Sequence, residues 1–113
     1  MTQSIVRPDV SHYAYRVVWS AEDQEFAATC AEFPSLSWLA ADQVEALQGL
    51  ETLVSEILDD LEAEGAELPQ PFADRPYSGK LNLRLGPHLH RRVALEAAEA
   101  GLSINSYLVR KVS

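Results

Sequence analysis

Three polar side chains alternate with leucines near the carboxyl-terminal end of the chain. In the stretch KLNLRL the polar residues are Lys80, Asn82 and Arg84. Because successive side chains of a β-strand point to opposite faces, a strand here presents these three residues together on one face. Lysine and arginine can donate hydrogen bonds to guanine O6 and N7, and asparagine can pair with adenine N6 and N7. The spacing therefore favours contacts with base edges in DNA, although a solvated sheet edge has the same pattern.

The distribution of charge supports a nucleic-acid ligand for this part of the chain. From Ser78 onward there are six basic and two acidic residues, a net charge of +4, whereas the whole chain carries -8. The first 77 residues hold three basic and fifteen acidic residues, a net charge of -12. Regions of opposite sign in one short chain indicate two tasks, and an acidic region favours a basic partner. The alternative is that the acidic residues only keep the first region in solution.

The carboxylates of the first region do not form a catalytic pattern. A two-metal nuclease needs several carboxylates that converge on ions about 3.5–4 Å apart. The first expected strand, Tyr13–Trp19, contains no acidic residue, Glu22 and Asp23 fall in the expected turn, and Glu32 is isolated. The acidic residues of the expected helix are spaced as a solvated face. We therefore expect no enzyme activity, with a metal-dependent nuclease as a remote alternative.

The histidines and the cysteine give no sign of a metal site or a nucleophile. His12, His88 and His90 have no metal-binding spacing with an acidic residue, and we expect surface or capping roles for them. Cys30 is the only cysteine and lies in an apolar stretch, which favours a place in the core. No glycine-rich phosphate loop is present. The sequence therefore predicts no metal and no cofactor.

The first region is expected to form a small α+β domain. Tyr13–Trp19 is rich in aromatic and β-branched residues, Ser20–Gln24 is polar turn material, and Glu25–Ala31 resumes the strand. The stretch SLSWLA is expected to add a third short strand. This order predicts a small antiparallel sheet with one helix packed on it.

The helix is expected in the stretch DQVEALQGLETLVSEILDDLEAEG. Asp42 followed three residues later by Glu45 is typical of a capping box, in which each acid accepts a hydrogen bond from a backbone N–H. Gly65 is suited to end the helix. Apolar residues at helical spacing predict one buried face. Its members are Val44, Leu47, Leu50, Val54, Ile57, Leu58 and Leu61.

The end of the chain is expected to form a strand and two helices. After an extended connector with three prolines, the strand covers residues 79–85, and Pro87 opens a first helix that ends near Gly101. Ser103 is suited to cap the second helix. Apolar residues at helical spacing line the two helices: Leu89, Val93, Ala97, Ile104, Tyr107, Leu108 and Val112. Domains below ~40 residues usually need a disulfide, a metal or a partner, so we expect the strand to pair with the same strand of a second copy.

The start of the second helix is expected to hold a phosphate group. Its first backbone N–H groups lack partners within the helix, and such a positive end attracts anions. The residues concerned are Ser103, Ile104, Asn105 and Ser106. Phosphate contacts set the register of a protein on DNA and carry no sequence information of their own.

The stretch GKLNLRLGPHLHRRVALEAAEAGLSINSYL resembles the ribbon-helix-helix fold of bacterial and phage repressors. With the hairpin-and-helix domain before it, the chain from about Tyr13 to Val112 resembles HicB-type antitoxins. That resemblance implies a partly degraded RNase H-like domain that binds a HicA-like ribonuclease toxin, and a final segment that binds operator DNA. HicB domains often carry Pro-Gly after the second strand, where this chain has Pro34 and Ser35. Candidate toxin contacts are the exposed edges of the hairpin and Trp38, for which core packing is the alternative.

We therefore predict two domains: a HicB-like, partly degraded RNase H-like toxin-binding domain over residues 1–77, and a ribbon-helix-helix DNA-binding and dimerisation domain over residues 78–113. The expected function is that of an antitoxin that neutralises the toxin and represses its own operon, as a homodimer or higher homo-oligomer. The alternative is a solitary ribbon-helix-helix transcriptional regulator whose first domain senses a ligand or mediates assembly.

No membrane-spanning apolar run occurs, and MTQSIVRPDVSH has no apolar signal core, so we expect a cytoplasmic protein without a membrane partner.

Overall fold

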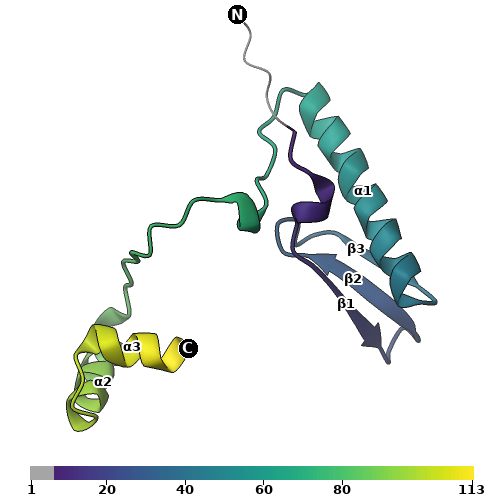
Figure 1. The fold of residues 1–113 in the computed structure, drawn as a ribbon. Coiled ribbons are helices and arrows are strands. Elements are labelled where there is room, and N and C mark those ends of the chain that lie inside the picture. Colours follow the sequence, from purple (N-terminus) through teal and green to yellow (C-terminus); the bar gives the residue numbers. More distant parts are fainter. Residues whose placement is uncertain (1–6) are drawn as a thin grey trace, which may run out of the picture. The chain divides into compact units, whose positions relative to one another are not determined.

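A computed structural model describes residues 7–113 of the chain (Figure 1). By its internal contacts the chain divides into two compact units, Met1–Pro76 and Tyr77–Ser113. Residues 1–6, which contribute to the expectation of no export signal, lie outside the described residues.

The first unit contains a three-stranded antiparallel sheet in the order β1-β2-β3. The strands are β1 (Tyr15–Ser20), β2 (Glu25–Cys30) and β3 (Ser37–Ala40). The predicted hairpin and third short strand are therefore confirmed. The first strand begins two residues later than predicted, because Tyr13 leaves the strand and enters the core, where it is 4% exposed.

One long helix, α1 (Gln43–Ala63), packs on one face of this sheet (Figure 1). The interface between helix and sheet forms the core of the first unit. Its buried members are Tyr13, Ala28, Cys30, Phe33, Ala46, Leu50, Val54 and Leu58. The predicted α+β class and the buried place of Cys30 are confirmed, and burial raises the pKa of the Cys30 thiol.

The ends of α1 follow the predicted caps at Asp42 and Gly65, but the bond expected to the Glu45 carboxylate is not formed among the described residues. The Asp42 side chain accepts a hydrogen bond from the Glu45 backbone N–H at 2.9 Å. At the other end Gly65 has a φ of +69°, which lets the Ala66 N–H donate to the carbonyl of Leu61 at 2.9 Å.

The predicted burial of Val44 is wrong, since its side chain is 62% exposed. Ala46 lies on the buried face instead. Two helical residues add up to ~200° of rotation, so Val44 points away from the sheet when Ala46 points toward it.

A glycine within α1 makes room for the one tryptophan of β3. A methyl group added at Gly49 would overlap the indole ring of Trp38, so the ring lies directly on the helix backbone at this point. Trp38 is nevertheless 42% exposed, which places it between core packing and the surface. The close approach explains why a residue with poor helix propensity stands in the middle of α1.

Replacing Gly49 with alanine should therefore destabilise the first unit, against the usual trend. In an ordinary helix interior this change stabilises by up to about 1 kcal/mol. Here we expect the free energy of unfolding to fall by about 1–3 kcal/mol, because the indole of Trp38 must move. Urea unfolding followed by circular dichroism measures the change.

The Trp38→Ala background provides the control for this substitution. Without the indole ring, Gly49→Ala should regain its ordinary stabilising sign. If Gly49→Ala stabilised the protein with Trp38 in place, the contact between the indole ring and the helix would not contribute to the free energy of unfolding.

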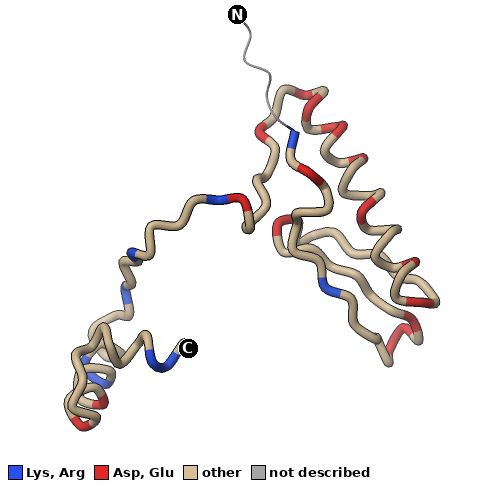
Figure 2. The backbone as a smooth tube through the Cα atoms, in the orientation of Figure 1, with Lys and Arg blue, Asp and Glu red and all other residues tan. Residues whose placement is uncertain are grey.

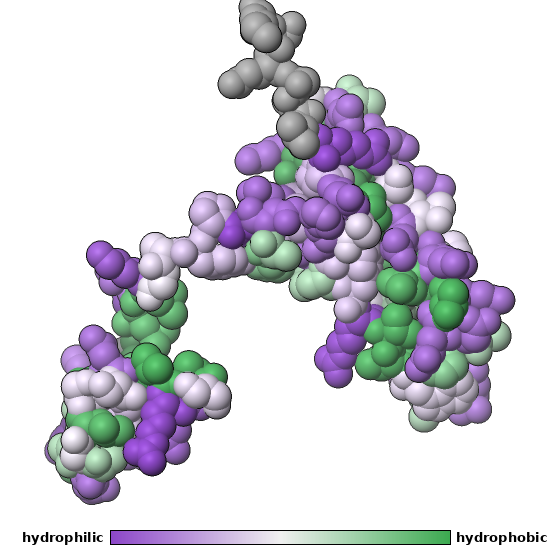
Figure 3. Space-filling view, viewed as in Figure 1, coloured by the Kyte–Doolittle hydropathy of each residue, from purple (hydrophilic) through white to green (hydrophobic). Residues whose placement is uncertain are grey.

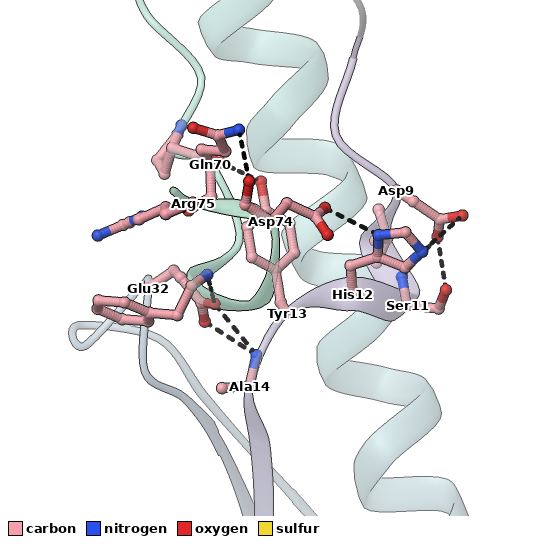
Figure 4. Close-up of polar contacts among 12 residues, drawn as sticks. Asp9, Ser11, His12, Tyr13, Ala14, Glu32, Gln70, Asp74 and Arg75 are labelled. Carbon is pink, nitrogen blue, oxygen red and sulfur yellow. Dashed lines mark hydrogen bonds and ion pairs between the residues drawn. The ribbon is translucent and has the colours of Figure 1, made fainter. Parts of the chain in front are cut away.

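The segment that follows α1 returns to the start of β1 and is held there by Glu32 (Figure 4). The Glu32 carboxylate accepts hydrogen bonds from the backbone N–H of Ala14 at 3.0 Å and of Phe72 at 2.9 Å. Partial burial alone would raise the pKa of Glu32, but these N–H donors outweigh it and the pKa is lowered. The sequence analysis did not predict this role of Glu32, whose ionised carboxylate joins segments that are 18 and 40 residues away.

Two further contacts hold the same connecting segment against the first unit. The Tyr13 hydroxyl donates to the carbonyl of Pro69 at 2.5 Å. His12 Nδ1 lies 2.8 Å from a carboxylate oxygen of Asp74, and this hydrogen bond raises the pKa of His12 (Figure 4). The connector is therefore ordered as far as the short 3-10 helix η2 (Phe72–Asp74), and His12 has the surface role that the sequence predicts.

Replacing Glu32 with glutamine should loosen this attachment. We expect a loss of about 1–3 kcal/mol at pH 7, because a neutral amide accepts the Ala14 and Phe72 N–H bonds more weakly than a carboxylate. A lowered pKa in the fold means that the stabilisation is complete above the ordinary value of 4.5 and is lost as the pH falls through the folded value. The difference between wild type and variant should accordingly shrink below about pH 4.5 in urea titrations.

The matched control is Glu67→Gln, an exposed acid in the same connecting segment. It should leave the stability unchanged at every pH. Equal losses for both variants would show that overall charge, and not the Glu32 hydrogen bonds, determines the effect.

Candidate nucleic-acid interface

The second unit consists of an extended segment and two helices, α2 (Gly86–Glu99) and α3 (Ile104–Val112). The chain turns between the helices at Gly101, whose φ is +70°. There the Leu102 N–H donates to the carbonyl of Ala97 at 2.9 Å, which is the same glycine-dependent cap that ends α1. The predicted break near Gly101 and the predicted second helix are confirmed.

The two helices share very little buried surface. Of the residues described in this unit, only Val93 and Ala97 are buried. A hydrogen bond from the Tyr107 hydroxyl to Glu96, 2.8 Å long, joins α3 to α2 and raises the pKa of Tyr107. Several large apolar side chains are exposed instead: Tyr77, Leu81, Leu83, Leu89, Leu95, Val109 and Val112. Figure 3 shows such hydrophobic side chains at the surface (green).

The segment predicted as a strand lies beside a groove and pairs with no other strand of the described chain. Residues 80–85 belong to neither a helix nor a strand in the single chain. Leu81 and Leu83, which belong to the expected buried face, are 86% and 58% exposed. The groove, with a volume of about 780 Å³, lies between this segment and one face of α3. Because the predicted partner strand comes from a second copy, the strand itself stays a prediction.

The groove brings together members of both sets of predicted contact residues. Lys80 and Asn82 of the extended segment line it, as do Ile104 and Asn105 of α3. Arg84 is exposed and does not line the groove.

The start of α3 has fewer free N–H groups than predicted. The Ser103 hydroxyl accepts the Ser106 N–H at 3.1 Å, and the Ser103 carbonyl accepts the Tyr107 N–H at 2.9 Å. Since Ser103 caps the helix in this way, Ser106 has already used its N–H. Two of the predicted N–H donors, those of Ile104 and Asn105, have no hydrogen-bond acceptor among the described residues.

Basic residues predominate in the second unit, and most of them are not neutralised. Figure 2 shows blue segments along the extended part, in α2 and at the end of α3. The described residues of this unit contain one ion pair, Arg92 Nε with Glu96 at 3.7 Å. The ammonium group of Lys111 lies 5.6 Å from the centre of the Tyr107 ring. The exposed arginines and lysines give the unit a positive surface, which suits a polyanion.

Two contacts of this unit could not have been predicted from the sequence. The Tyr107–Glu96 bond joins residues without a common motif, and His90 lines the groove although no spacing marks it.

Among the described residues, no group of three or more His, Cys, Asp or Glu side chains could hold a metal ion. The helices of residues 7–113 all lack the length and apolar character needed to span a lipid bilayer.

Comparison with known proteins relates the chain to one family. No curated protein and no solved structure matches it. Residues 62–112 match the HicB family, a range that runs from the last turn of α1 through the connector and both helices of the second unit. The match indicates a role related to toxin–antitoxin systems, and it supports HicB-type membership of this chain.

Proposed function

We propose that the protein is an antitoxin whose second unit forms a ribbon-helix-helix dimer on operator DNA and whose first unit binds a HicA-like ribonuclease toxin. The observation that carries the DNA part is the incomplete core of the second unit. Leu81 and Leu83 are exposed beside a groove whose far wall is the apolar face of α3. A second copy of the segment provides what this surface lacks, because its own leucines and backbone can complete the sheet and the core.

The dimer would place six polar side chains on one face of a two-stranded ribbon. Lys80, Asn82 and Arg84 of each copy alternate with the leucines, so they point away from the helices when the leucines point toward them. A two-stranded ribbon fits the major groove of B-DNA, where these residue types can distinguish base pairs. This arrangement accounts for an alternating segment that pairs with no strand in the described part of its own chain.

The start of α3 would fix the position of this ribbon on the DNA backbone. Its Ile104 and Asn105 N–H groups lie at the positive end of a helix, and Asn105 lines the same groove as Asn82. A phosphate bound there sets the register of the ribbon. The basic residues of the unit add an attraction that weakens as salt rises.

The first unit has the charge that a basic toxin requires. It carries 15 of the 17 acidic residues of the chain and 3 of its 9 basic residues. A toxin that cleaves RNA must attract phosphate groups, so its active surface is expected to be positive. An acidic antitoxin domain would speed the encounter with that surface and cover it.

Replacing Arg84 with alanine should relax the sequence preference of operator binding. We expect a loss of about 1–3 kcal/mol on the operator and little loss on unrelated DNA, because a base contact contributes to discrimination only. Electrophoretic shift assays with both DNAs measure the ratio. Size-exclusion chromatography should show an unchanged dimer.

The control for Arg84 is Lys111→Ala at the end of α3. A residue that contacts phosphate should weaken binding to both DNAs alike and reduce the salt dependence. An Arg84 variant with unchanged operator preference would argue against reading of bases by this segment.

Removal of residues 78–113 should separate the two proposed activities. The remaining chain keeps the whole α1–sheet core and the Glu32 attachment, so it should stay folded and bind the toxin. It should not shift operator DNA. Co-purification with the small basic product of the adjacent reading frame provides the test, and absence of such a product would favour a solitary regulator.

A further inference from the structure

One end of the first unit exposes large apolar side chains that the fold does not need. Val18 and Trp19 lie at the end of β1 and are 39% and 52% exposed, and Leu39 of β3 is 44% exposed. Val18 and Leu39 are both paired with Ala27 of β2, so the three residues form one row across the sheet. This row lies on the face opposite α1, because its neighbours in the strands, Ala28 among them, face the helix core.

Trp19, the next residue of β1, lies on the opposite face of the sheet from this row, because successive side chains of a strand alternate. Its ring packs edge-on against Phe26, with the ring centres 5.1 Å apart. Phe26 itself packs against the core beneath α1, so Trp19 belongs to the helix side of the sheet and not to the exposed row.

Carboxylates surround this end of the unit. Glu22 and Asp23 form the tip of the β1–β2 hairpin and Glu25 begins β2, while Asp42 and Glu45 mark the start of α1. β3 runs back toward the hairpin tip before α1 begins, and Figure 2 shows both acidic groups (red) at that end. None of these five forms an ion pair with a described residue.

Two acidic residues near the other end of α1 have ion-pair partners. Asp59 and Glu62 form ion pairs with Arg7, whose pKa is raised by its hydrogen bond to Asp59. Two acids near the end of α1 are thus neutralised, whereas none of the five acids at the hairpin end has an ion-pair partner among the described residues. An apolar centre with an unneutralised acidic rim is suited to a partner that has an apolar contact area and basic surroundings.

We propose that Val18 and Leu39, with the carboxylates Glu22, Asp23 and Glu25, form the turn-end surface on which a basic protein docks. This inference rests on the proposed function, since the basic protein is the toxin. A second copy of the chain is the less favoured occupant, because five unpaired carboxylates on each copy would face one another.

A pair of charge reversals tests the rim without touching the fold. Glu22 and Glu25 have no side-chain hydrogen bond or ion pair among the described contacts, whereas Asp23 accepts a hydrogen bond from Ser20 and is left unchanged. The test variant is Glu22→Lys with Glu25→Lys. The matched control is Glu56→Lys with Asp60→Lys, two exposed acids on α1 that give the same net charge.

Both full-length variants are titrated against the small basic protein of the adjacent reading frame by calorimetry. We expect the turn-end pair to weaken binding by about tenfold or more and to reduce its salt dependence, and the α1 pair to weaken it by less than about threefold. Equal effects of the two pairs would overturn the turn-end surface, because net charge would then suffice. Failure of the wild-type protein to bind would instead contradict the proposed function itself.

A second variant tests the apolar centre separately. Leu39→Ala removes an exposed side chain from the row and leaves the charge of the unit unchanged. It should weaken binding by about fivefold or more at every salt concentration, with the circular dichroism spectrum and the urea midpoint unaltered. Unaltered affinity would place the docking area outside this face of the sheet. A dimer that breaks up on the same change would identify a second copy as the occupant and overturn the proposal.

Discussion

The shortage of buried surface in the second unit is the constraint on which its proposed role depends. Val93 and Ala97 alone are buried among its described residues, and neither is large. Two such side chains cannot offset the conformational entropy lost by a unit of this length. Folding and association are therefore expected to be one process here, with a stability that varies with protein concentration.

The first unit is built in the opposite way, because it completes its own core. Helix α1 covers one face of the sheet, and the returning connector is held at Glu32. None of its described buried polar side-chain atoms lacks a hydrogen-bond partner. Side chains that remain exposed at its hairpin end are therefore not required for folding, and so they are available for recognition. The first unit can fold without a second copy of the chain, whereas the second unit is expected to need one. The proposed toxin binding therefore does not require dimerisation, but the proposed DNA binding does.

Local patterns in the sequence were sufficient to predict most of the elements. The cap of α1 at Asp42, its end at Gly65 and the turn at Gly101 depend on residues within a few positions of one another, and all three are confirmed. The role of Glu32 was missed because its partners are 18 and 40 residues away and are backbone groups, which no residue type reveals. Val44 was misplaced because helical periodicity alone does not fix the angle at which a helix meets its sheet.

The predicted contact residues depend on more than local pattern. Lys80, Asn82 and Arg84 can be named from alternation, but their common direction requires a paired strand, and pairing involves a second chain. At α3 the sequence identified the right turn of the helix but not that the Ser103 hydroxyl caps it by accepting the Ser106 N–H.

The contact between Gly49 and Trp38 has a consequence for how this fold can diverge. Substitutions at these two positions are therefore coupled. A residue larger than glycine at position 49 requires a smaller side chain at position 38, and without the indole ring position 49 can hold any residue of high helix propensity. Related sequences should therefore fall into two groups at these positions, and such paired variation would mark the helix and the third strand as neighbours even where every other residue has changed.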